Sequence, residues 1–185
     1  MAVSFESVRV LLAIAALATA GVTSVDSQPS APTDPSFQPG GEARAVAHMV
    51  GGIISYSRWP APQPQSLRIC TSGTTRFAAK LDEVSATARR AVNVRAVPAG
   101  SPTGDCDILY LGAMAPDTRL EMIRGVHRRA VLSIIETDQS CRSGAMICLH
   151  VRKSSVDFQL NIDAVSRSTV RIDPRVLLVA GGGGA

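Results

Sequence analysis

The chain has 185 residues, of which 45% are hydrophobic and 18% are charged, and its formal net charge is +4. This composition is typical of a globular protein and excludes an intrinsically disordered or fibrous chain. Aromatic residues make up only 4% of the chain, whereas nucleic-acid-binding domains usually combine clustered basic residues with stacking side chains. We therefore expect no nucleic-acid partner, and a modest positive charge better suits an acidic protein surface or an anionic envelope.

The N-terminus carries the pattern of an export signal. Arg9 precedes an apolar run over residues 10–22, and Ala18-Thr19-Ala20 fits the small-x-small cleavage pattern. The run is about 13 residues long, whereas a membrane-spanning helix needs roughly 20. Residues 1–20 are therefore expected to be a cleaved signal peptide that directs the protein to the periplasm. A retained membrane anchor is the alternative, because Arg9 is the only basic residue before the run.

The rest of the chain divides into three parts. Residues 21–41 are rich in Ser, Pro, Asp and Gln, a composition that cannot bury enough apolar surface to order itself, so we expect a flexible leader. Residues 42–180 have the usual size of one domain. The glycine-rich residues 181–185 are expected to form a flexible tail.

Four cysteines lie in the exported part of the chain, at Cys70, Cys106, Cys141 and Cys148. An even number of cysteines in an oxidising compartment indicates two disulfides, for which three pairings exist. Cys141 and Cys148 flank a short loop that contains Gly144, which favours a local bond and leaves Cys70 to pair with Cys106. We expect no metal site, since there is no C-x-x-C motif and the histidines are isolated.

Hydrophobic periodicity predicts the elements of the first half of the domain in chain order. A helix is expected over residues 42–58, ending before Pro60, and the pair Gly51-Gly52 within it suggests close packing against another backbone. A strand over 67–70, a turn at 71–73, a helix over 74–89 and strands over 92–97 and 107–111 follow.

In the second half, a helix is expected over residues 115–127 and a strand over 130–135. Residues 147–151 and 156–160 are predicted to form a hairpin. Asp173-Pro174 has the pattern of an N-cap followed by proline at the first helical position, so a short helix should follow through Leu178. This order predicts a single α/β domain with a mixed, mostly parallel sheet, helices on both faces, a C-terminal hairpin and a short final helix.

Two sets of residues are candidate binding sites. Thr71, Ser72 and Gly73 lie between a strand and a helix, where backbone N–H groups can surround a small ligand. The apolar residues of the C-terminal segment cannot all fit one core stripe, so some should contact a partner. The partner-binding candidates are Val165, Val170, Ile172 and Val176.

The sequence favours a binding protein over an enzyme. A serine–histidine arrangement lacks the G-x-S-x-G elbow, and the cysteines lack the C-x-x-C pattern of thiol oxidoreductases. We expect neither catalytic residues nor a cofactor.

Several segments together resemble the YfiR-like family of periplasmic proteins. The matching pieces are residues 53–60 (IISYSRWP), 67–70 (LRIC), 106–112 (CDILYLG), 144–147 (GAMI), 157–161 (DFQLN) and 171–180 (RIDPRVLLVA). Their order, together with four cysteines at matching places, resembles the repressor branch of that family.

The resemblance implies a periplasmic inhibitor of an inner-membrane diguanylate cyclase, which would lower cyclic di-GMP and so affect biofilm formation. Its expected partners are the periplasmic domain of that cyclase, an outer-membrane peptidoglycan-binding lipoprotein that sequesters the inhibitor, and a second copy of the chain in a homodimer. A periplasmic small-ligand sensor that feeds a different membrane receptor is the alternative.

Overall fold

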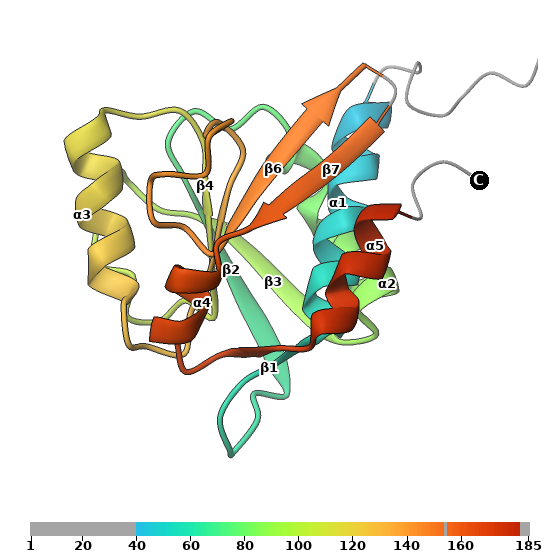
Figure 1. Cartoon of the computed structure of the whole chain (residues 1–185), viewed down its shortest axis with the longest axis horizontal. Helices are drawn as coiled ribbons and strands as arrows, with labels where there is room; N and C mark the ends of the chain where they lie inside the picture. Colours follow the sequence, from blue (N-terminus) through green and yellow to red (C-terminus); the bar gives the residue numbers. More distant parts are fainter. Residues whose placement is uncertain (1–39, 154, 182–185) are drawn as a thin grey trace, which may run out of the picture. The chain divides into compact units, whose positions relative to one another are not determined.

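The structure, a computed structural model, describes residues 40–153 and 155–181, which form a mixed α/β domain around one six-stranded sheet (Figure 1). Its strands are, in spatial order, β3 (Ala91–Ala96), β2 (Ser66–Ser72), β4 (Ile108–Leu111), β5 (Leu132–Ile135), β6 (Ile147–Arg152) and β7 (Ser155–Leu160). Every neighbouring pair is parallel except the β6–β7 hairpin, which is antiparallel. The predicted fold class is confirmed.

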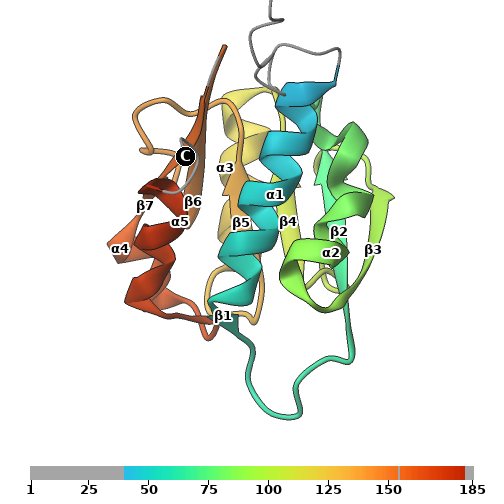
Figure 2. The same cartoon turned by 90° about the vertical axis from the view of Figure 1, so that its right-hand side faces the viewer.

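The sheet separates two apolar cores because side chains alternate between its faces. In β4, Ile108 and Tyr110 enter the larger core, whereas Leu109 and Leu111 enter the smaller one. The helices α1 (Gly41–Ser55), α2 (Val84–Ala88) and α5 (Leu177–Gly181) cover the first face, and α3 (Pro116–Val126) covers the second (Figure 2). Helices therefore lie on both faces, as predicted.

The glycine pair in α1 allows two other helices to approach it closely. A Cβ added at Gly51 would lie 2.6 Å from Cβ of Thr87, and one added at Gly52 would lie 2.6 Å from Cγ1 of Val179. Both separations are too short for real carbon atoms. The close packing predicted from Gly51-Gly52 is present: a Cβ at Gly51 would lie 3.1 Å from the backbone oxygen of Val84 in α2, whereas the neighbour of Gly52 is the Val179 side chain in α5 and not a backbone.

The first helix ends earlier than predicted. It stops at Ser55, and the next residues form a short strand, β1 (Ser57–Arg58), that pairs with β8 (Arg171–Ile172) in a separate two-stranded sheet. The prediction of helix to residue 58 was wrong because the backbone of β1 pairs with β8, a segment far away in the sequence. Such a pairing has no signal in local periodicity.

The predicted helix over residues 74–89 is largely replaced by other structure. Only η2 (Ala78–Glu83), a 3-10 helix, and α2 (Val84–Ala88) form there. Thr74 instead makes an isolated bridge with Ala113, and the backbone N–H groups of Arg76 and Phe77 donate to the Glu136 carboxylate. These tertiary contacts hold the start of the segment out of a helix.

The end of the chain contains one predicted helix and one unpredicted helix. Asp173 caps η3 (Pro174–Val176) through its side chain and α5 follows, as expected. The additional helix is α4 (Ile162–Arg167), which begins where the Asn161 side chain accepts a hydrogen bond from the N–H of Ala164. The expected signal peptide and almost all of the expected leader and tail lie outside the described residues. Within residues 40–153 and 155–181, no helix is long and apolar enough to cross a membrane.

Candidate partner-binding surface and ligand loop

The three residues of the candidate ligand loop lie together at the C-terminal end of β2. Gly73 adopts a φ of +78°, and a Cβ there would lie 2.7 Å from the carbonyl oxygen of Ala113. The N–H of Thr74 donates to that oxygen at 2.8 Å. Ser72 is buried and its Oγ donates to Sδ of Met122 at 3.7 Å. The loop thus makes its main polar contacts within the protein.

Glu136 holds the chain beyond this loop, and its role had no signal in the sequence beyond its place after a strand. The carboxylate is buried at the end of β5 and accepts from the N–H groups of Arg76 and Phe77 and from the Tyr110 hydroxyl, the last at 2.7 Å. Burial, together with the negative charge and hydrogen bond of Glu136, raises the pKa of Tyr110. The hydroxyl therefore remains a donor, and all three donors compensate the buried carboxylate.

Both disulfides lie in the smaller core, beneath α3. Cys70 is bonded to Cys106 and Cys141 to Cys148, with Cα–Cα separations of 5.8 and 5.5 Å. Both separations lie within the usual range for disulfides. The expected pairing of Cys141 with Cys148 and of Cys70 with Cys106 is present, and Cys106 precedes β4 in the chain.

The four partner-binding candidates divide into two groups. Val170 and Val176 are 0% exposed and belong to the larger core. Val165 and Ile172 are half-buried and pack against that core. This is a correction to the predicted surface, because two of its members have no area to offer a partner.

The same C-terminal segment also contains exposed apolar residues. Ile162 on α4 is 68% exposed, and Leu177 and Leu178 on α5 are 57% and 69% exposed. Both helices follow β7 and lie towards its edge of the sheet (Figures 1 and 2). We define the C-terminal surface as Ile162, Val165, Ile172, Leu177 and Leu178.

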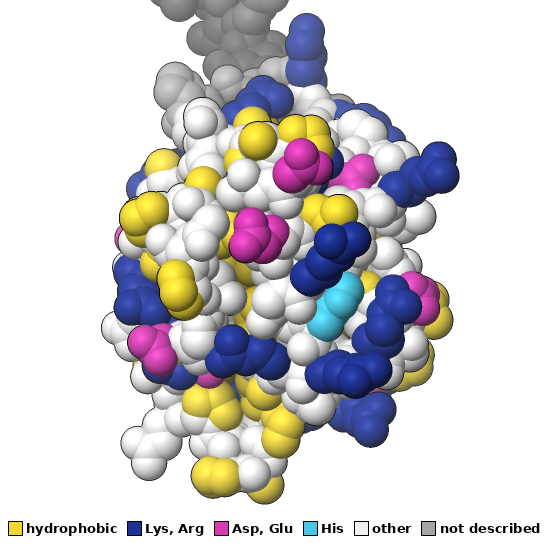
Figure 3. All heavy atoms as spheres, turned by 90° about the vertical axis from the view of Figure 1, so that its left-hand side faces the viewer, with side chains coloured by type: hydrophobic (Ala, Val, Ile, Leu, Met, Phe, Trp, Pro, Cys, Tyr) yellow, Lys and Arg dark blue, Asp and Glu magenta, His cyan; other side chains and the backbone are white. Residues whose placement is uncertain are grey.

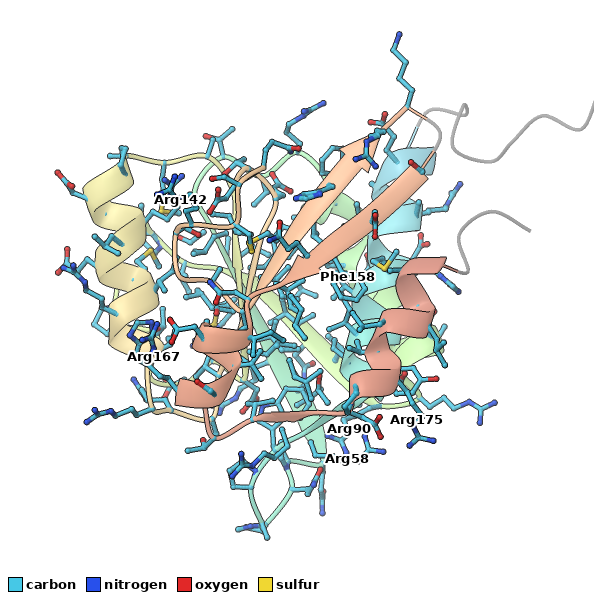
Figure 4. The ribbon with its side chains drawn as sticks, viewed as in Figure 1. Arg58, Arg90, Arg142, Phe158, Arg167 and Arg175 are labelled. Carbon is cyan, nitrogen blue, oxygen red and sulfur yellow. A yellow bond between two sulfur atoms is a disulfide. The ribbon has the colours of Figure 1, made fainter. Side chains whose placement is uncertain are left out.

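Basic side chains are prominent on two parts of the domain. On the face that carries α3, they gather around a histidine (Figure 3). At the end of the domain near β1, Arg58 comes from β1, Arg175 from η3, and Arg90 from the connection between α2 and β3 (Figure 4). Arg90 lies 5.9 Å from the ring centroid of Trp59, and Arg175 lies 6.0 Å from that of Tyr56.

The β1–β8 ribbon places like charges opposite each other, since Arg58 pairs with Arg171 in its register. Directly opposed like charges destabilise a strand pair. The negative charge of Asp173 offsets this repulsion. The Arg175 side chain donates hydrogen bonds to the Asp173 carboxylate and lowers its pKa to about 2, and the positive charge of Arg58 also contributes. The ribbon therefore presents a basic, aromatic edge balanced by one ionised carboxylate.

No cluster of three or more His, Cys, Asp or Glu side chains suited to a metal ion occurs among residues 40–153 and 155–181. The polar groups around the candidate loop bond to the protein's own backbone, and the exposed residues of the C-terminal surface are apolar. Together, these features describe a disulfide-bonded α/β domain with surfaces suited to binding.

The family model described as YfiR/HmsC-like matches residues 43–181, and the chain belongs to this family. It is a family of periplasmic regulators associated with diguanylate cyclase signalling. The match covers the whole described domain except its first three residues, 40–42. It includes both disulfides and the C-terminal surface.

Proposed function

We propose that this protein is a periplasmic repressor that binds the periplasmic domain of an inner-membrane diguanylate cyclase and keeps cyclic di-GMP synthesis low. An outer-membrane peptidoglycan-binding lipoprotein sequesters the repressor and relieves the inhibition. Export by cleavage of residues 1–20 delivers the protein to the compartment where both partners are accessible. Family membership supports the regulatory role, and the surface of the domain supports the mode of action.

The observation that carries the proposal is the C-terminal surface. Ile162, Leu177 and Leu178 are each more than half exposed, and Val165 and Ile172 of the same C-terminal segment are half-buried. Exposed apolar side chains that occur together on a folded domain mark an interaction site. The nearby Arg171 and Arg175 are exposed and supply positive charge at the rim, where complementary charge on a partner increases the rate of association.

Repression by binding requires a difference in affinity. A ligand shifts a two-state equilibrium only by the ratio of its affinities for the two states. The repressor must therefore bind the inactive cyclase more tightly than the active one, and the lipoprotein must compete for the same repressor.

The test is to delete the gene and measure cyclic di-GMP after complementation with variants. The unaltered chain should lower cyclic di-GMP, whereas Leu177→Asp and Ile162→Asp should not, although their melting temperatures remain unchanged. Val94→Asp is the matched control, because Val94 is 38% exposed on β3 at the opposite edge of the sheet. Equal repression by all variants, or no rise after deletion, would contradict the proposal.

The same surface would serve a homodimer, for which sedimentation of the unaltered chain and of Leu177→Asp provides the test.

The second candidate function is a small-ligand sensor that feeds a different membrane receptor. Its candidate site is the loop at Thr71, Ser72 and Gly73, which lies at the C-terminal end of β2, where open α/β sheets commonly bind ligands.

A further inference from the structure

Three arginines cluster where α3 ends and the chain leads to β5. Arg124 lies in the last turn of the helix, and Arg128 and Arg129 follow the helix end. All three are exposed, and none forms an ion pair with a carboxylate of the described chain. They belong to the face that carries α3, where Figure 3 shows basic side chains gathered around a histidine. Like charges placed so close together repel one another, and an external anion would remove this repulsion.

A fourth arginine, Arg167 on α4, extends the cluster. The hydroxyl of the next residue, Ser168, donates to the backbone carbonyl oxygen of Arg129 at 3.4 Å, so the end of α4 lies against the segment after α3. Figure 4 shows Arg167 beside α3. The Arg167 side chain pairs with Asp163 on its own helix but is still 48% exposed. We define the arginine surface as Arg124, Arg128, Arg129 and Arg167.

The acidic residues nearby leave the arginine surface positively charged. On α3 they lie nearer the N-terminal end, at Asp117 and Glu121, so charge is divided along the helix. Nη2 of Arg129 donates to the carbonyl oxygen of Gly104 at 3.0 Å. The neighbouring Asp105 pairs instead with Arg95, at 3.9 Å. Within the described chain, only Asp163 forms an ion pair with the surface.

The arginine surface lacks the apolar centre of a tight protein–protein contact. Of the exposed large apolar side chains in the described chain, none lies on α3 or in the segment between α3 and β5. Stable protein interfaces combine a buried apolar core with a polar rim. A membrane surface requires no such core, because its headgroup phosphates repeat in every direction. Arginine also binds phosphate through two parallel hydrogen bonds.

We propose that the arginine surface docks on the anionic phospholipid headgroups of the inner membrane. The contact is weak and reversible, because it consists of a few exposed charges. It does not rest on the proposed repressor function, and the two are compatible. Helix α5 covers the opposite face of the sheet from α3, so Leu177 and Leu178 stay accessible (Figure 1). A protein held at the membrane meets a membrane partner at a higher effective concentration.

The test is sedimentation of the exported chain, residues 21–185, with sucrose-loaded vesicles of phosphatidylglycerol and phosphatidylcholine in equal parts. The protein should pellet with these vesicles at low ionic strength and should not pellet with vesicles of phosphatidylcholine alone. Salt at about 1 M, where the Debye length is about 3 Å, should release it. One basic side chain near an anionic lipid surface strengthens binding about fivefold, so Arg124→Gln/Arg128→Gln should weaken binding about 25-fold.

The matched control is Arg89→Gln/Arg152→Gln. Arg89, like Arg128, is an exposed arginine with positive φ at a helix end, and Arg152 is exposed at the end of β6. Neither belongs to the arginine surface. Both double variants remove two positive charges, so they differ only in where the charge is lost. The control should bind the vesicles as the unaltered protein does, and all variants should keep their melting temperature.

Three results would overturn the proposal. Equal weakening in the two double variants would show that net charge alone attracts the protein. Equal binding to vesicles of phosphatidylcholine alone would show that the headgroup charge is not recognised. Absence of vesicle binding would exclude the membrane, and a loss of repression in Arg124→Gln/Arg128→Gln would then assign the surface to an acidic protein. The vesicles contain no cyclase, so failure of the repressor function would leave these results unchanged.

Discussion

At the residue scale, the buried carboxylate of Glu136, just after β5, connects the segment that follows β2 with strand β4. It receives hydrogen bonds from the backbone beyond β2 and from Tyr110 of β4. Glu136→Gln keeps the shape but replaces one acceptor oxygen by a donor, which leaves a buried donor unpaired. We expect a loss of about 2 kcal/mol or more in the free energy of unfolding, measured in urea. Glu121→Gln on the exposed side of α3 is the control and should leave stability unchanged.

Asp138 gives the domain an acid-sensitive element. Burial tends to raise the pKa of its carboxyl, but hydrogen bonds from Ser143 and Ser140 outweigh burial and lower it below 3.8. A lowered pKa in the folded state stabilises the domain fully above the ordinary pKa, and this contribution disappears as pH falls through the lowered value. Stability should therefore fall below about pH 4.

Asp138→Asn tests this directly by urea unfolding at several pH values. The variant should be less stable at neutral pH and should lose less stability on acidification than the unaltered protein. Asp82→Asn, at an exposed position of η2, should retain the original pH dependence. An unchanged acid response in Asp138→Asn would show that other groups cause it.

The sequence predicted those residue-level features that depend on residues close together in the chain. The Asp173-Pro174 cap and the Cys141–Cys148 bond involve neighbours in the chain, and both are present. The burial of Val170 could not be predicted, because it depends on how the segment after α4 lies against the larger core.

At the element scale, the glycines of α1 set the distance between helices. Gly52→Ala would place a methyl group against Val179, so α5 should be displaced and the free energy of unfolding should fall. Gly125→Ala in α3 is the matched control, since an added Cβ there meets nothing within 4 Å. It should stabilise the domain by up to about 1 kcal/mol through helix propensity. Equal stabilisation by both substitutions would refute the packing role of Gly52.

The two disulfides are expected to differ in the ease of reduction. Their Cα–Cα separations are similar, so strain gives no reason for a difference. However, Nε of Arg95 donates to Sγ of Cys70 at 3.4 Å. A neighbouring cation stabilises a thiolate and makes it a better leaving group. Cys70–Cys106 should therefore open first under reduction, loosening the smaller core and weakening repression.

Mass mapping of alkylated cysteines during a redox titration measures this order. Arg95→Gln should slow the opening of Cys70–Cys106, whereas Arg124→Gln on the exposed side of α3 should not. Earlier opening of Cys141–Cys148, or no effect of Arg95→Gln, would contradict the hypothesis.

The sequence predicted the type of an element correctly where one hydrophobic pattern, helical or alternating, dominated the segment. Both strands of the β6–β7 hairpin and helix α3 appear within a few residues of their predicted limits. The failures, in residues 74–77 and at β1, share one cause: the backbone there bonds to partners about 40 to over 100 residues away, Ala113, Glu136 and β8. Local propensity cannot anticipate such contacts.

At the scale of the whole molecule, the disulfides and the proposed binding surface lie on different parts of the domain. The disulfides and α3 close one face of the sheet, whereas α4, β8 and α5 present apolar and basic side chains at the β7 side. Sequence resemblance anticipated the family, which the family model now shows. The position of the proposed contact surface needed the structure, because the exposure of Ile162 and Leu177 depends on the packing of the final segments.

The most direct test of the repressor function is site-specific photo-crosslinking in the native envelope. A photoreactive amino acid placed at Leu177 should crosslink the protein to an inner-membrane protein that carries a diguanylate cyclase domain, identified by mass spectrometry. The same amino acid at Val94, on the opposite edge of the sheet, should not. Crosslinks from Leu177 that contain no diguanylate cyclase, or equal crosslinking from Val94, would contradict the account.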